Sequence, residues 1–184
     1  LGGGPAAATP FGVYRPATVP ADLVPQYVHL RSASDRPDPV MVESVAPPGA
    51  PVDVDPTPPM PSPEGSATVV PLGRVLGTRS GDKGGDANLG IYARTDLGWA
   101  WLDNELTVER LHQLLPETAS LTTERFRFPA IRSLNFVING LLEEGVAAST
   151  RQDAQAKAVG EWLRARVLSI PDVVLRAEES RPVG

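Results

Sequence analysis

One short segment, residues 79–88, concentrates the side chains that could do chemistry. It reads RSGDKGGDAN and holds three glycines, a lysine, two aspartates, a serine and an asparagine. Glycine allows a positive φ and a close approach of the backbone to a ligand, and successive backbone N–H groups in a turn can bind an anion. Lys83 would add positive charge there, and the two aspartates would orient it or bind a cation. We therefore predict a ligand site made of Ser80, Gly81, Asp82, Lys83, Gly84, Gly85, Asp86 and Asn88.

The segment departs from the standard phosphate-binding motifs. A P-loop needs a Gly-Lys pair followed by Ser or Thr, whereas Lys83 stands between Asp82 and Gly84. The GxGxxG fingerprint of dinucleotide-binding folds is absent as well. The alternative interpretation is a tight turn that joins two strands and leaves its charged side chains in solvent. Ser80 has no histidine near it in sequence, and no other nucleophile–base pair is evident, so the catalytic residues stay unknown.

The chain resembles the C-terminal domain of the acyclic-terpene-utilisation (AtuA-type) proteins over about residues 68–171. The resemblance is carried by RSGDKGGDANLGIYAR, WLDNELTVERLHQLLPE, FPAIRSLNFVINGLL and GVAASTRQDAQAKAVGEWLRARV. It implies a ferredoxin-like α+β domain without iron, and a role in the catabolism of isoprenoid or branched acyl compounds. It also implies coenzyme A thioesters as the substrate class to consider and a larger domain upstream. It implies no particular reaction, so whether the domain belongs to an enzyme stays open.

Composition excludes several classes of site. The chain has no cysteine and only two histidines, which rules out disulfides, thiolate nucleophiles and iron–sulfur clusters and leads us to predict no metal site. A net charge of −5 argues against a nucleic-acid partner. The sequence has no apolar run long enough to span a membrane, and its start is unlike a signal peptide, so we expect a cytoplasmic protein. Because the chain begins at Leu1, we expect a fragment or a processed piece of a longer protein.

Proline content marks a boundary near residue 65. Sixteen of the 20 prolines lie in residues 1–71. Proline fixes φ and removes a backbone donor, so such a stretch favours extended structure over a regular core. We predict that residues 1–65 are a proline-rich arm and linker, the tail of a larger upstream domain, without helix or strand over 46–65. Residues 66–184 are then the AtuA-like ferredoxin-fold domain.

The patterning of residues after 66 predicts the fold class. We expect strands over 68–76 and 88–94, short helices capped by Asp96 and Thr107, strands over 121–128 and 134–138, a helix over 152–168 and a last strand near 173–175. This order is a ferredoxin-like two-layer α+β sandwich with an added N-terminal strand, preceded by the proline-rich arm. Helices would cover one face of the sheet and leave the other to dock on the upstream domain, on a partner subunit or on a second copy.

Weaker candidates lie outside the glycine-rich segment. Asn135 could present its amide near that segment, and Ser149–Arg151 would precede the last helix, where backbone N–H groups attract anions. His112 is more typical of a surface or boundary position, and the basic strand face of Arg125 and Arg127, with Arg132, is more typical of a solvated or interface surface. Two functions follow: an accessory domain that binds an anionic ligand, or a structural oligomerisation or domain-docking module with no ligand of its own.

Overall fold

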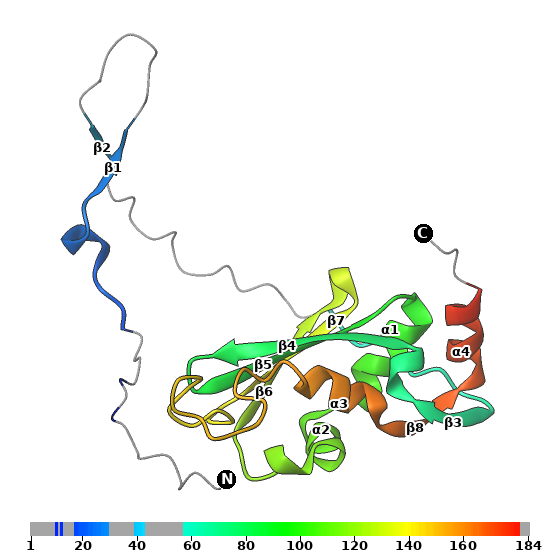
Figure 1. Ribbon diagram of the computed structural model, residues 1–184. Helices are drawn as coiled ribbons and strands as arrows, with labels where there is room; N and C mark the ends of the chain where they lie inside the picture. The colour runs from blue at the N-terminus through cyan, green and yellow to red at the C-terminus, as the bar shows by residue number, and fades with distance from the viewer. Residues whose placement is uncertain (1–9, 11, 13–16, 30–38, 43–56, 181–184) are drawn as a thin grey trace, which may run out of the picture. The chain divides into compact units, whose positions relative to one another are not determined.

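Side chains alternate between buried and exposed along the strands of a four-stranded sheet, which organises the larger part of the chain. The computed structural model describes residues 10, 12, 17–29, 39–42 and 57–180. Within residues 57–180 the sheet is antiparallel throughout, in the order β4-β5-β7-β6 (Figure 1). Its strands are β4 (Leu76–Lys83), β5 (Asp86–Ala93), β6 (Thr123–Phe128) and β7 (Ser133–Ile138).

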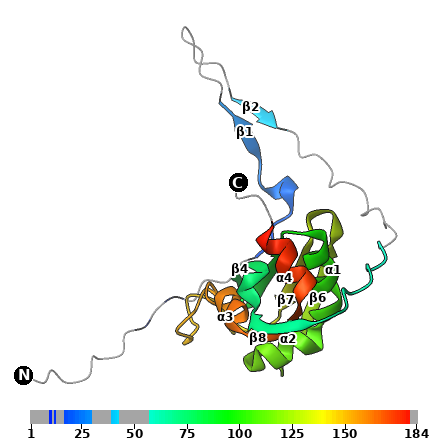
Figure 2. The same ribbon diagram turned by 90° about the vertical axis from the view of Figure 1, so that its right-hand side faces the viewer.

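Three helices cover one face of this sheet and form the core with it (Figure 2). They are α1 (Asp96–Glu105), α2 (Val108–Leu114) and α3 (Val159–Ala165). Thr107 caps α2 as predicted, since its side chain accepts a hydrogen bond from the Arg110 backbone N–H. The cap of α1 is Thr95, one residue before the predicted Asp96. The fully buried side chains of the sheet and the helices include Leu89, Ile91, Leu134, Phe136, Leu102, Leu111 and Leu163.

The topology confirms the predicted ferredoxin-like sandwich. After β5, the two helices α1 and α2 lead to β6, and β7 returns between β5 and β6, which is the split βαβ arrangement. The added N-terminal strand is present as β4, which forms a hairpin with β5 and occupies the free edge beside it. The last strand, β8 (Val167–Pro171), does not enter this sheet.

A second, two-stranded sheet explains why three of the elements predicted from the sequence have the wrong boundaries. The predicted strand over 68–76 ends early, because β3 (Ala67–Pro71) is followed by a 3-10 turn, η2 (Leu72–Arg74), and β4 begins only at Leu76. β3 pairs with β8, whose residues were assigned to the end of a helix and to a loop. The predicted strand near 173–175 lies inside α4 (Asp172–Glu179).

The last predicted helix is shorter than expected for a local reason. The Asp153 carboxylate accepts hydrogen bonds from the backbone N–H groups of Lys157 and Ala158, which folds residues 153–158 into a turn. Ala156, at φ +53, lies within this turn in a left-handed conformation that no α-helix contains. Consequently α3 begins only at Val159.

Two further 3-10 turns, η3 (Pro116–Thr118) and η4 (Pro129–Ile131), connect elements of the larger unit. Among the residues between 15 and 56, which form a separate unit, the structure describes a 3-10 turn, η1 (Ala21–Leu23), and an antiparallel pair of β1 (Gln26–Val28) with β2 (Val40–Val42). Residues 57–66 contain no helix or strand, as predicted for the linker, and residues 46–56 lie outside the described part. The boundary near residue 65 therefore stays a prediction.

Within residues 57–180, no helix covers the second face of the four-stranded sheet. Tyr92, Phe126 and Phe128 project from it and are 41%, 43% and 47% exposed. Exposed aromatic side chains on a sheet face are costly to leave in water and commonly mark a binding surface. We call this face, formed by β4, β5, β7 and β6, the open face.

Candidate ligand-binding site

The glycine-rich segment is a β-hairpin and not the loop that the sequence suggested. Its residues up to Lys83 belong to β4, those from Asp86 onward to β5, and the turn is only Gly84–Gly85. Gly84 has a φ of +67, and Gly85 has no positive φ, which is the pattern of a type II′ hairpin turn. The turn conformation therefore requires glycine only at Gly84. At Gly81 and Gly85, the space available for a side chain depends on packing against other parts of the chain.

Gly85 and Asp86 are held by the chain that follows β7. A Cβ at Gly85 would collide with the Glu143 carbonyl oxygen, so only glycine fits. The Asp86 Oδ1 accepts a hydrogen bond of 2.7 Å from the Gly140 backbone N–H. The Leu142 N–H donates to the Gly85 carbonyl at 2.8 Å. These contacts give two predicted site residues a structural role at the hairpin tip.

Ser80 and Asp82 point to the helix side of the sheet. Ser80 Oγ accepts from the Gly160 N–H at 3.0 Å and donates to the Lys157 carbonyl at 3.2 Å, which fixes the approach to α3. The Asp82 Oδ1 lies 4.0 Å from the Lys157 Nζ. Asn88 lies on the opposite, open face, because it pairs with Gly81 and not with Ser80 or Asp82. The eight predicted site residues therefore do not converge on a single ligand position.

What the hairpin does bring together is a group of cations, which we call the cationic edge: Arg79, Lys83 and Lys157. Arg79, Gly81 and Lys83 lie on the same face of β4, because residues two apart on a strand share a face. The Lys157 Nζ lies over Gly81, only 3.0 Å from where a Cβ would stand. Lys83 Nζ donates to the Asp82 carbonyl at 3.0 Å. In the described part of the chain, no residue hydrogen-bonds to the Arg79 guanidinium or forms an ion pair with it.

The cationic edge borders a polar hollow of about 300 Å³, lined by Thr78, Arg79, Ser80, Lys157, Gly160 and Glu161. The Glu161 carboxylate is already paired with Arg164 at 2.9 Å. Because β4 is an edge strand, every second backbone N–H along it points away from β5 and adds donors. Positive charge and hydrogen-bond donors together suit an anion. Lys157 could not be found from sequence, since it lies 77 residues from Ser80 with no local motif.

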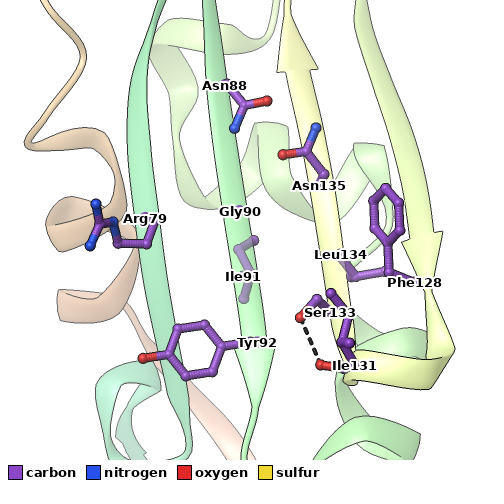
Figure 3. Close-up of a pocket in the computed structure, with 10 residues that line it drawn as sticks. All are labelled: Arg79, Asn88, Gly90, Ile91, Tyr92, Phe128, Ile131, Ser133, Leu134 and Asn135. Atoms are coloured by element: carbon purple, nitrogen blue, oxygen red, sulfur yellow. Dashed lines mark hydrogen bonds between the residues drawn. The ribbon is translucent and has the colours of Figure 1, made fainter. Parts of the chain in front are cut away.

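A second hollow, which we call the open-face groove, lies on the open face and measures about 330 Å³ (Figure 3). It is lined by Arg79, Asn88, Gly90, Ile91, Tyr92, Phe128, Ile131, Ser133, Leu134 and Asn135. The Tyr92 ring lies directly over Gly77, where a Cβ would collide with it. Gly90, in mid-strand, leaves the floor of the groove without a side chain. The groove thus has apolar walls and a flat floor.

Two side-chain amides form the polar part of this groove. Asn88 and Asn135 lie on neighbouring strands and face the space above Gly90 (Figure 3). Neither carboxamide has a hydrogen-bond partner among the residues that the structure describes. Asn135 was predicted to lie near the glycine-rich segment, and the structure places it diagonally across from Asn88. Each amide can donate and accept one or more hydrogen bonds to a ligand.

The predicted basic strand face is not solvated. Arg125 and Arg127 point to the helix side and both bind Asp103 of α1, at 2.9 and 2.6 Å. The Asp103 side chain is only 1% exposed. Burial raises the pKa of Asp103, but the hydrogen bonds and charges of Arg127 and Arg125 outweigh it and hold that pKa below its usual value. This cluster joins α1 to β6 and is structural.

The remaining weaker candidates do not reach either hollow. Because α3 starts at Val159, Ser149–Arg151 do not precede it directly, and Arg151 instead lies 5.8 Å from the centre of the Trp162 ring. His112 Nε2 lies 3.1 Å from Thr123 Oγ1, at the contact of α2 with β6. Within the described residues, no three His, Asp or Glu side chains come together to hold a metal ion. None of the described helices is both long and apolar enough for a membrane span.

The split βαβ topology and the antiparallel sheet define a ferredoxin-like α+β domain. The family model for the AtuA ferredoxin-like domain matches residues 70–169, more than half of the chain, and the chain belongs to this family. The matched range contains both strands of the hairpin, the cationic edge and all residues of the open-face groove. No match was found to a curated protein or to a solved structure.

Proposed function

We propose that this domain is an accessory C-terminal domain of an acyclic-terpene-utilisation-type protein, acting in the catabolism of isoprenoid or branched acyl compounds. In this proposal it binds an anionic group of the substrate or of its carrier, such as a coenzyme A phosphate. A large domain of the same protein, or a partner subunit, supplies the reaction. The family membership supports the proposed catabolic role, and the geometry of the hairpin supports the binding of an anionic group.

The observation that carries the proposal is that Arg79, which has no partner among the residues that the structure describes, lines the same hollow as Lys157. Like charges repel one another at short range, so a protein that holds two cations at one hollow gains by binding an anion there. Lys83 extends the positive strip to the hairpin tip, and the Asp82 carboxylate, at 4.0 Å from Lys157, offsets it only in part. In this proposal the anion site lies along β4, which precedes the glycine turn, and not at the turn itself.

The test is calorimetric titration of the full-length protein with coenzyme A, inorganic phosphate and small carboxylates. A charge-assisted hydrogen bond contributes about 1.5–3 kcal/mol, so Arg79→Ala and Lys157→Ala should each weaken binding by roughly tenfold to a hundredfold. Lys83→Ala should weaken it less, since that side chain already donates to the Asp82 carbonyl. Arg166→Ala removes one exposed charge elsewhere and should leave the affinity unchanged. No binding by the wild type, or equal losses in all four variants, would count against the proposal.

A structural docking module is the second candidate, and the exposed aromatic side chains of the open face favour it. In that case the open face is buried against a second copy or against the large domain. Sedimentation velocity separates the two: a concentration-dependent dimer that Phe126→Ser disrupts supports docking, whereas a monomer at all concentrations opposes self-association.

A further inference from the structure

The two hollows adjoin at a single side chain. Arg79 lines both the cationic hollow and the open-face groove. Figure 3 shows its guanidinium extending away from the centre of the groove, toward the side of β4 on which α3 lies. A ligand bound to that guanidinium could therefore continue across the stem of Arg79 into the groove.

The groove differs from the cationic hollow in chemistry. Its walls are the rings of Tyr92 and Phe128 and the side chain of Ile131, which is 67% exposed. Burying such surface is favourable by roughly 25 cal/mol per Å², so the groove attracts an apolar group. Within its lining, the only ionisable groups are Arg79 at one margin and the Tyr92 phenol. The groove therefore suits an uncharged aliphatic chain.

The two amides lie where an uncharged polar group would be needed. Asn88 is the register partner of Gly81, over which the Lys157 ammonium lies, and Asn135 pairs with Gly90 on the floor. A carbonyl placed between an anionic head and an aliphatic chain would accept hydrogen bonds from these side-chain N–H groups. Neither amide has to give up a partner within the described structure to do so.

We infer that the open-face groove holds the aliphatic chain of an acyl compound whose anionic head or carrier is bound at the cationic edge, with Asn88 and Asn135 on the acyl carbonyl. This inference deepens the proposed function and rests on it, because Arg79 and Lys157 bind the anionic group in both proposals. The groove then selects the length and branching of the acyl chain, while the edge recognises the carrier.

The experiment compares coenzyme A with its acetyl, butyryl and octanoyl thioesters by calorimetry on the full-length protein. Each methylene buried in the groove should tighten Kd by about fourfold at most, the equivalent of about 0.8 kcal/mol, until the groove is full. Phe128→Ala should remove most of this dependence on chain length and leave the affinity for coenzyme A itself unchanged. Phe126→Ala is the matched control: the side chain is similarly exposed on the same strand but does not line the groove.

The outcomes separate the two proposals. If coenzyme A binds through Arg79 and Lys157 but all thioesters bind equally, the groove does not hold the chain and only the anion site survives. If Phe126→Ala and Phe128→Ala lose the chain-length dependence alike, the face acts as a whole and the assignment to the groove is wrong. If neither coenzyme A nor any thioester binds, both proposals fall. Asn88→Ala and Asn135→Ala should weaken all three thioesters by the same factor relative to coenzyme A and leave the chain-length dependence and the stability unchanged; equal affinity of these variants and the wild type for the thioesters would overturn the placement of the carbonyl.

Discussion

The ammonium of Lys157 lies directly over Gly81, so that a Cβ there would come within 3.0 Å of Nζ. Gly81 has no positive φ, and the strand conformation does not require glycine at this position. The glycine instead leaves space in which a lysine from a distant part of the chain reaches the β4 edge. Gly81 first suggested a flexible backbone, but its missing side chain instead leaves space for the positively charged Lys157 ammonium.

Replacing Gly81 with alanine should weaken anion binding and leave the fold intact. The added methyl group meets only the end of a flexible lysine, which can move away, so the free energy of unfolding should change by less than about 0.5 kcal/mol. The displaced ammonium should cost up to about tenfold in affinity for coenzyme A. Calorimetry and urea unfolding on the same preparations check both parts. A variant that binds as tightly as the wild type would show that anion binding does not depend on the position of the Lys157 ammonium over Gly81.

The glycines of the hairpin turn should respond differently. Gly84→Ala forces a positive φ on a residue with a Cβ and should destabilise the domain by about 1–2 kcal/mol. Gly85→Ala places its Cβ against the Glu143 carbonyl oxygen, which is backbone and cannot swing away, and overpacking of this kind costs roughly 1–3 kcal/mol. Gly90→Ala is the control, because its Cβ would have contacts of 3.5 and 3.9 Å, and it should unfold like the wild type. Urea midpoints measure all three.

Asp103 should be the most sensitive charged residue for stability. Removing it leaves two arginines without their buried partner, and breaking a buried ion pair typically costs about 3–5 kcal/mol. Asp103→Ala should therefore lower the urea midpoint sharply. Asp96→Ala, which breaks an exposed pair with Arg132, should cost less than about 1 kcal/mol.

The same carboxylate predicts a pH dependence. Because its pKa is lower in the folded than in the unfolded protein, Asp103 stabilises the fold above the unfolded pKa of about 4, and this contribution disappears as the pH falls through the folded value. The difference in unfolding free energy between wild type and Asp103→Ala should be constant near neutral pH and shrink below about pH 4. A difference that stays constant down to about pH 2 would contradict the assignment of the stabilisation to the charged form.

Limited proteolysis should cut the chain first between residues 46 and 65. The prolines there remove backbone donors, and residues 57–66 have no helix or strand. The carbonyls of Thr57 and Met60 do accept hydrogen bonds from Arg127 and Asn104, so cleavage before residue 57 should precede cleavage after it. Mass spectrometry of the early fragments checks this order, and equal resistance of the linker and the C-terminal part would contradict the boundary.

Local sequence patterns predicted the strands and helix starts whose conformation depends on residues close in the sequence. The alternation around Phe126 and Phe128 and around Leu134 and Phe136 marked β6 and β7, and Thr107 marked the start of α2. The pairing of β3 with β8 was missed, because nothing within a short strand identifies a partner that lies about 100 residues away in the sequence. The turn formed by Asp153 depends on one side chain that could equally have capped a helix.

The candidate site was harder to predict for the same reason. Gly84 and Lys83 are informative in sequence, but the cation that completes the edge comes from the approach to α3, and Asn135 comes from a strand that is not adjacent in sequence. Asp86 suggested ligand chemistry, but its carboxylate accepts a hydrogen bond from the Gly140 backbone N–H. Residue types indicated the chemistry, and only the fold could show which of them face the same space.

The antiparallel pairing of β3 with β8 sets how the domain would respond to tension. Ala67 is opposite Pro171, and the Asp172 N–H donates to the Ser66 carbonyl, so the chain enters and leaves this small sheet at the same corner. A pull on the two flanking segments would load the hydrogen bonds of β3 and β8 one after another, in the manner of a zipper, before it reached the four-stranded sheet. Because α4 follows β8 directly and packs against α1, a pull from the C-terminal side would have to detach this helix before the two strands could peel apart, and the four-stranded sheet would be loaded last.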